Sequence, residues 1–182
     1  MPAPVALLFG AARRFGATTM TTLPGSVLRG EFRMFVYGME TYSKALKIIE
    51  RELGVGVTAD DELDRVGHFL FRDAWAGVAP ADRLLALTPA KPFGIVNTRP
   101  PPGEHWMGVC YEDKRHHIVY DSFGRQALRI TSHPKKLAPR GIHIEDTDQD
   151  AEQRLEEENC GQRSLAWLCV AALRGVDVAR TI

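Results

Sequence analysis

The sequence has few cysteines and no excess of either charge. Its 182 residues include three Cys, and 23 Lys and Arg balance 23 Asp and Glu. Three Cys are too few for a disulfide-rich scaffold. An odd, sparse count fits a reducing compartment, where a thiol is a buried hydrophobe or a reactive group. The zero net charge excludes a surface that is basic throughout, although local basic patches are compatible with it.

The sequence also lacks long hydrophobic runs. None approaches the roughly 18 residues of a membrane span. The apolar run at residues 2–12 has no positive residue before it and is followed by Arg13 and Arg14, the reverse of the charge order in a signal peptide. We therefore expect a soluble monomer that is not secreted and has no membrane partner. The length suits one domain.

Residues 1–38 show no sustained hydrophobic period and contain five Gly. The first 33 residues carry four Arg against one Glu. This composition predicts a weakly basic, loosely ordered arm, or else a loop packed on the body. We therefore divide the chain into an N-terminal extension, 1–38, and a folded domain, 39–182.

Two helices are predicted next. Apolar residues at helical spacing predict one at 43–53, with Thr41 or Ser43 as its cap and Gly54 as its stop. A short acidic helix is expected at 60–65. An aromatic cluster follows, which comprises His68, Phe69, Phe71 and Trp75, and we expect His68 to be core.

From residue 93 the pattern changes to strands. Buried or alternating runs predict three consecutive strands that form a meander, at 93–98, 105–111 and 118–123. The turn between the last two, EDKRHH, includes His116 and His117. A basic segment and a short strand at 141–144 follow.

The last third of the chain combines an acidic run with an apolar one. Residues 145–159 carry eight carboxylates against one Arg, which predicts a solvated loop. Residues 160–175 are apolar on nearly all sides, which predicts a buried central helix. A group at this junction would lie at the solvent edge of a buried helix.

Cys160 stands at that junction and is the candidate nucleophile. With Asn159 as the N-cap, Cys160 would lie in the first turn, where unpaired N–H groups and the helix dipole favour a thiolate. The alternative is a buried Cys that only starts a core helix. The carboxylates at 156–158 oppose an anion there unless they point into water, so a cation is needed.

His105 and Asp121 complete a candidate triad with Cys160. His105 opens a strand, which places an imidazole at the end of the sheet, where it could stabilise the thiolate and later protonate a leaving amine. If the strands around EDKRHH pair antiparallel, Asp121 comes beside His105 and can orient it. Each residue alone also has an ordinary structural reading. The other histidines read as surface or core: His68, His116, His117, His133 and His143.

Gln153 is the candidate oxyanion-hole residue. It precedes Cys160 by seven positions, and its amide N–H, together with the backbone N–H of Cys160, could stabilise a tetrahedral intermediate. Gln149 and Gln162 are the competitors.

The stretch GIVNTRPPPGEHWMGVCYEDKRHHIVYDSFG, 94–124, resembles the adenain family of adenovirus maturation endopeptidases. That family has an IVNT strand, a Gly-rich loop, an HW pair and a strand ending in an acidic residue before PFG. Its catalytic His matches His105, the adjoining aromatic residue Trp106, and its acidic member Asp121. Its oxyanion Gln, six or seven positions before a Cys-Gly pair, matches Gln153. The resemblance covers about 43–174.

The resemblance implies an α+β fold, with a mixed central sheet flanked by helices and Cys160 heading the central helix. It implies a cysteine endopeptidase domain at 39–182 that cleaves viral capsid and core precursor proteins during virion maturation. It also implies a preference for small residues near the cut, with Trp106 narrowing the substrate groove. The expected location is the virion and the host cell interior, including the nucleus.

No cofactor is required for this chemistry, but the family is stimulated by DNA and by a disulfide-linked peptide. The family's peptide-linking Cys falls near Ile142 here, so that link is not expected. The basic segment that includes Lys135, Lys136 and Arg140 leaves a weak DNA contact open.

Three alternatives stand beside the endopeptidase. They are an isopeptidase for ubiquitin-like modifiers, an inactive virion structural protein of the same fold, and a metal site. A metal site built on Cys110, His116 and His117 has no fourth ligand at a usual spacing, so we expect no metal.

Overall fold

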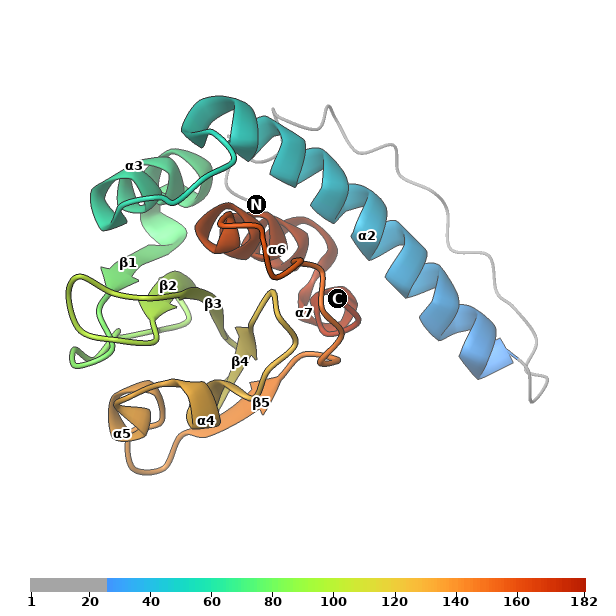
Figure 1. Ribbon diagram of the computed structural model, residues 1–182. Helices are drawn as coiled ribbons and strands as arrows, with labels where there is room; N and C mark the ends of the chain where they lie inside the picture. Colours follow the sequence, from blue (N-terminus) through green and yellow to red (C-terminus); the bar gives the residue numbers. More distant parts are fainter. Residues whose placement is uncertain (1–25) are drawn as a thin grey trace.

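The computed structural model describes residues 26–182, which form an α+β fold with one mixed five-stranded sheet flanked by helices (Figure 1). The predicted fold class is therefore confirmed at this level. Residues 1–25, most of the predicted arm, lie outside the described residues. The helices are α2 (Ser26–Leu53), α3 (Asp60–Phe71), the 3-10 helix η1 (Arg72–Ala74), α4 (Ala127–Ile130), α5 (Pro134–Leu137), α6 (Cys160–Arg174) and α7 (Val176–Ala179). The strands are β1 (Trp75–Ala79), β2 (Phe93–Asn97), β3 (Trp106–Tyr111), β4 (His116–Tyr120) and β5 (His143–Asp146).

The five strands lie in chain order across the sheet. The predicted meander is confirmed, since β3 pairs antiparallel with both β2 and β4. The outer strands β1 and β5 run parallel to their neighbours. Alternate residues of each central strand face two separate cores, as the two-residue period of a strand requires. Ile95, Ile118 and Tyr120 join the core shared with α2, α3 and α6, whereas Val96 and Val119 join the core shared with α4.

Helix α6 lies between the sheet and α2 and is buried from Gly161 to Ala171 (Figure 1). Its Trp167 ring stacks on Tyr120 at the end of β4, with centroids 5.4 Å apart and planes 7° apart. The indole Nε1 of Trp167 also donates to the carbonyl of Ala179 in α7, at 2.8 Å. This packing holds α6 against the end of β4, directly before Asp121.

Helix α2 is longer than predicted. It begins at Ser26 and not near residue 43, so 26–38 are helical and the expected boundary at 38 falls inside the helix. The part that packs on the body carries the apolar period, whereas Phe35, Val36 and Tyr37 are exposed. A helical turn that covers no core needs no apolar stripe, so periodicity does not reveal it. Gly38, which resembles a breaker, lets α7 approach: a Cβ there would lie 3.0 Å from side-chain atoms of Val178 and Ile182.

Thr41 and Ser43 therefore do not cap this helix. Both lie inside α2, and the hydroxyl of Thr41 donates to the carbonyl of Tyr37, one turn earlier, at 3.0 Å.

Three histidine expectations need correction. His68 and Phe69 are exposed, because Leu63, Val66 and Leu70 occupy the core-facing side of α3. Phe71 and Trp75 are core, and their rings stack with centroids 5.5 Å apart. His116 and His117 lie in β4 and not in a turn, since the strand begins earlier than expected, and His117 is buried.

The acidic segment 145–159 is only partly solvated. Gln153 and Asn159 are buried, and the backbone N–H of Gln153 donates to the carbonyl of Ser122 at 2.9 Å. The segment is therefore anchored to the end of β4. No helix within residues 26–182 has the length and apolar character needed to cross a membrane.

Candidate active site

The loop before β3 fixes the position of His105. The side-chain Oδ1 of Asn97, at the end of β2, accepts hydrogen bonds from the backbone N–H groups of Arg99 and Glu104, at 3.0 and 2.9 Å. Gly103 has a φ of 85°, and a Cβ there would lie 2.6 Å from Nδ2 of Asn97. The RPPPGE loop is thus closed over Asn97, and His105 follows directly at the edge of the sheet.

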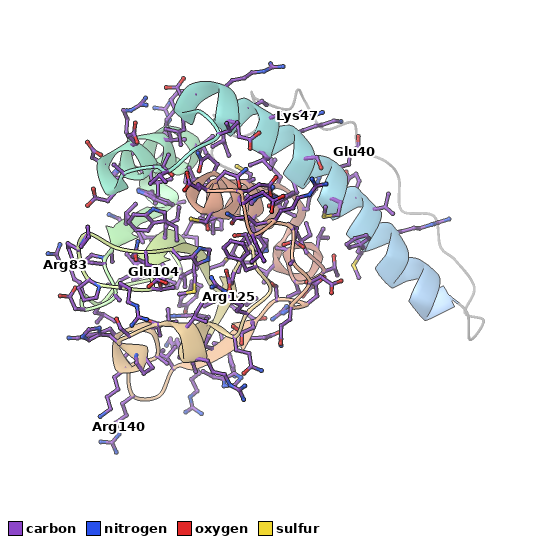
Figure 2. All side chains as sticks on the ribbon, in the orientation of Figure 1. Glu40, Lys47, Arg83, Glu104, Arg125 and Arg140 are labelled. Atoms are coloured by element: carbon purple, nitrogen blue, oxygen red, sulfur yellow. The ribbon has the colours of Figure 1, made fainter. Side chains whose placement is uncertain are left out.

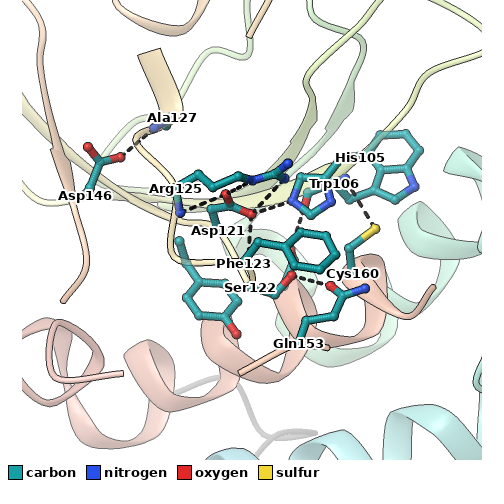
Figure 3. A network of polar contacts seen from close by, with 12 residues as sticks. His105, Trp106, Asp121, Ser122, Phe123, Arg125, Ala127, Asp146, Gln153 and Cys160 are labelled. Carbon is teal, nitrogen blue, oxygen red and sulfur yellow. Dashed lines mark hydrogen bonds and ion pairs between the residues drawn. The ribbon is translucent and has the colours of Figure 1, made fainter. Parts of the chain in front are cut away.

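The antiparallel pairing of β3 and β4 brings His105 to Asp121, as the sequence predicts. Gly108 pairs with Tyr120, so the residues beyond these strands lie side by side. The Nε2 atom of His105 lies 2.5 Å from Oδ1 of Asp121, and the two residues are only 6% and 3% exposed (Figure 3). The remaining ring nitrogen of His105, Nδ1, is the one available to Cys160.

Cys160 is the first residue of α6 and is half-buried. Its Sγ accepts a hydrogen bond from the backbone N–H of Trp106 at 3.5 Å, which ties the thiol to the start of β3 (Figure 3). The first hydrogen bond of α6 runs from Arg163 N to Asn159 O, at 3.0 Å. The N–H groups of the first turn therefore have no partner within the helix.

Asn159 does not cap α6 with its side chain, contrary to the prediction. Its Oδ1 accepts from Nε of Arg163 at 2.8 Å, and its Nδ2 donates to Oε1 of Glu50 in α2 at 2.7 Å. The residue before Cys160 is thus held by two helices.

The charges around the thiol favour an ion pair. Burial opposes ionisation of Cys160, but contact with His105 and the backbone N–H groups of Trp106 and Gly161 outweighs it, so the pKa of this thiol is lowered. Burial likewise opposes charge on His105, but its hydrogen bonds with Asp121 and Cys160 prevail and raise its pKa. Both shifts move the pair towards thiolate and imidazolium.

Asp121 stays ionised. Burial alone would raise the pKa of this carboxyl, but the side chains of His105 and Arg125 lower it to about 2. Nε of Arg125 donates to Oδ2 of Asp121 at 2.8 Å. The acid is therefore held as an acceptor that orients and charges the imidazole.

The side chain of Gln153 is fixed close to the ends of β4 and α6. Its Oε1 accepts from the hydroxyl of Ser122 at 2.6 Å, and its Nε2 donates to the carbonyl of Glu157 at 2.5 Å. An amide nitrogen has two N–H groups, so one is left for another acceptor.

The competing glutamines lie elsewhere. Gln149 is exposed, and Gln162 is buried where its Nε2 donates to the carbonyls of Gly54 and Gly56. Among the three glutamines considered, only Gln153 bonds to a neighbour of Asp121.

Trp106 forms one wall of a groove of about 630 Å³. Its indole Nε1 donates to the carbonyl of Thr58 at 3.1 Å, which fixes the ring. Thr58, Val78, Asn97 and Glu104 are among the other residues that line this groove. The fixed indole leaves little freedom for the wall nearest His105 to adapt.

The acidic residues before Cys160 do not crowd the thiol. Glu156 and Glu158 are exposed, and Oε2 of Glu157 accepts a hydrogen bond from Nη2 of Arg163 at 3.0 Å. Solvent thus screens the charges of Glu156 and Glu158, and Arg163 pairs with that of Glu157, so these carboxylates oppose a thiolate only weakly.

Two further residues of this site escaped the sequence analysis. They are Arg125, bonded to Asp121, and Phe123, whose ring lies 5.2 Å from the His105 ring. No spacing rule identifies them, because both follow Asp121 in an irregular turn. The alternating pattern ends there.

The remaining thiols are inert by position. Cys110 and Cys169 are buried, and burial raises the pKa of each to about 12. Within residues 26–182 no group of three or more His, Cys, Asp or Glu side chains could hold a metal ion, so Cys110, His116 and His117 do not form one. Comparison of the chain with known protein families, with curated proteins and with solved structures gives no match.

Proposed function

We propose that this protein is a cysteine endopeptidase. The observation that carries the proposal is the placement of His105, whose Nε2 bonds to the buried Asp121 while its ring contacts the thiol of Cys160 at the start of α6. A nucleophile, a base and a residue that orients the base are the parts that nucleophilic catalysis requires. Three segments far apart in the sequence supply them.

The chemistry follows from these contacts. The thiolate of Cys160 attacks the substrate carbonyl carbon, and a tetrahedral intermediate forms. His105 then gives its proton to the leaving amine as the C–N bond breaks, which leaves a thioester on Cys160. His105 then takes a proton from a water molecule that attacks the thioester. The C–S bond breaks, which releases the carboxylic acid and regenerates the thiolate of Cys160 and the imidazolium of His105.

The oxyanion of each intermediate needs hydrogen-bond donors. The backbone N–H of Cys160 lies in the unbonded first turn of α6, and the free N–H of Gln153 is the proposed second donor. Fixing Gln153 through Ser122 and Glu157 reduces the reorganisation needed during the reaction.

The proposed substrates are viral capsid and core precursor proteins, cleaved during virion maturation inside the host cell. The adenain resemblance of 94–124 supports this, and so does the mixed sheet with Cys160 heading a central helix. The rigid Trp106 wall gives a physical reason for a preference for small residues near the cut.

An isopeptidase for ubiquitin-like modifiers uses the same residues and is the second candidate. The groove beside Trp106 would receive an extended glycine-containing chain end in an isopeptidase and an internal peptide segment in an endopeptidase. An inactive virion protein is less well supported, because all four candidate residues are present and His105 contacts both Asp121 and Cys160.

The described residues differ in what they offer to the two activators known for the adenain family. A disulfide-linked peptide finds no exposed partner in the described residues, where Ile142 stands at the family's position and both other thiols are buried. A weak DNA contact has a surface available in the exposed Lys135, Lys136 and Arg140, the last of which projects beyond α5 (Figure 2). Such a contact would weaken as salt rises.

The test is to digest a mixed peptide library and, separately, conjugates of ubiquitin-like modifiers. New N-termini are then identified by mass spectrometry. Cleavage within peptides by the wild type, and none by Cys160→Ala, supports the endopeptidase. Cleavage of conjugates alone favours the isopeptidase, and equal cleavage by Cys160→Ala contradicts both.

A further inference from the structure

The carboxylate of Asp121 is held by more than His105. Its Oδ2 accepts from the backbone N–H and Nε of Arg125, at 3.1 and 2.8 Å. Its Oδ1 accepts from the backbone N–H of Phe123 at 3.2 Å, besides its contact with His105, and Nη2 of Arg125 lies 3.4 Å away. The side chain of Arg125 is 42% exposed, whereas that of Asp121 is 2% exposed. The exposed Arg125 thus forms hydrogen bonds with both carboxylate oxygens of the buried Asp121.

The ring of Phe123 provides a second link between Arg125 and His105. The guanidinium carbon of Arg125 lies 4.7 Å from the centroid of Phe123, within the range of a cation–π contact. The same ring contacts the imidazole of His105 at 5.2 Å, with planes tilted by 37° (Figure 3). Phe123 therefore contacts both the guanidinium and the imidazole.

We propose that Arg125 is a positioning residue of the reaction, which holds His105 through Asp121 and through the ring of Phe123. This inference rests on the proposed function. Arg125 touches neither the thiol nor the expected scissile bond, so its effect passes through the two residues that contact the imidazole.

The contacts of Arg125 with Asp121 matter because His105 must keep one orientation throughout the reaction. His105 must serve Cys160, the leaving amine and the attacking water in turn, while Nε2 keeps its bond to Asp121. Without the guanidinium, the carboxylate would keep only His105 and two backbone N–H groups as partners, and it could turn more freely with the ring. The planar guanidinium fixes the carboxylate plane through parallel N–H groups and also stacks on an aromatic face. A lysine ammonium offers a point charge that does neither.

The test uses Arg125→Gln and Arg125→Lys, with Arg129→Gln as the matched control. Arg129 is a nearby exposed arginine on α4 with no contact to Asp121. The measurements are kcat and KM on a cleaved peptide, and the rate of Cys160 alkylation by iodoacetamide as a function of pH. Thermal unfolding of each variant checks that the fold is kept.

For Arg125→Gln we expect kcat to fall roughly tenfold with KM changed less than about twofold. The pH midpoint of Cys160 alkylation should rise, because the imidazole is held less firmly and a positive charge is removed. Arg125→Lys should recover part of kcat, since it restores the charge without the fork. Arg129→Gln should match the wild type.

A loss confined to KM would overturn the proposal in favour of direct substrate contact, and unchanged kcat and alkylation would overturn it outright. The alkylation readout needs no peptide turnover. If the wild type cleaves no peptide but Arg125→Gln still shifts the alkylation midpoint, the proposed function fails while the positioning role stands.

Discussion

The Nε2 atom of His105 lies 2.5 Å from Oδ1 of Asp121, although 16 residues separate them in the chain. The hairpin formed by β3 and β4 joins them at its open end, and both side chains are buried. Within this pair the acid is charged and the ring is oriented, so the other nitrogen of His105 is directed to Cys160.

Asp121→Asn should weaken hydrolysis without abolishing it. An asparagine oxygen can still accept from Nε2 of His105, but the charge that stabilises the imidazolium is lost. We expect kcat to fall on the order of tenfold to a hundredfold, less than for His105→Ala, which removes general acid–base catalysis worth roughly 10²- to 10⁴-fold. Steady-state kinetics of the two variants on one peptide measure this. An equal loss in both would mean that the role of Asp121 is misassigned.

Gln153→Ala should lower kcat and leave KM nearly unchanged. The amide donates to charge that develops only in the transition state, and losing one such donor costs roughly a hundredfold or more. Gln149→Asn is the matched control, because Gln149 is exposed and asparagine tolerates its positive φ of 67°. A similar loss in both variants would show that the effect comes from the loop and not from the donor.

Cys160 should react with iodoacetamide at a pH where the other two thiols do not. The lowered pKa of Cys160 means that its thiolate persists as pH falls below the range of an ordinary thiol, whereas the pKa of Cys110 and Cys169 is raised to about 12. Peptide mapping after labelling at about pH 6 should find the adduct on Cys160. His105→Ala should move the alkylation midpoint of Cys160 upward. Equal labelling of Cys110 would contradict this account of the charges.

Glu152→Gln should stabilise the fold, and more so as pH rises. Oε2 of Glu152 is buried with no hydrogen-bond partner among the described residues, and burial, together with Asp148, raises the pKa of Glu152 to about 7. A carboxyl with a raised folded-state pKa adds stability below its unfolded value, and this stability is lost as pH rises through about 7. The difference is at most about 3 kcal/mol, and solvent screening of the half-buried side chain reduces it.

Urea unfolding at about pH 5 and about pH 8 measures this effect. The gain in free energy of unfolding for Glu152→Gln should be larger at the higher pH. Glu156→Gln, a change at an exposed position of the same segment, should show no such pH dependence. A gain that is equal at both values would assign the effect to packing instead of charge.

The sequence predicted the elements that periodicity and local chemistry determine. The strand runs of β2, β3 and β4 and the apolar helix α6 were clear from the residues alone, and the hairpin geometry correctly brought His105 to Asp121. These features depend on neighbours in the chain or on one antiparallel pairing.

Other features depend on contacts between distant segments. Phe35, Val36 and Tyr37 of α2 are exposed, so no apolar stripe marks that turn of the helix. Gly38 has its role only because α7 lies against it. Asn159 was expected to cap α6, but Arg163 and Glu50 bind its side chain instead. The contact of Arg125 with Asp121 likewise depends on the fold of an irregular turn, which the sequence pattern does not show.

The most direct test of the central claim is to trap the acyl-enzyme. Wild type and Cys160→Ala are mixed with a cleaved peptide or its ester, quenched in acid during the first turnover, and mapped by mass spectrometry. We predict an acyl group on Sγ of Cys160 that hydroxylamine removes, with neither adduct nor cleavage in Cys160→Ala. An acyl group on another residue, or undiminished cleavage by Cys160→Ala, would contradict the proposed cysteine endopeptidase.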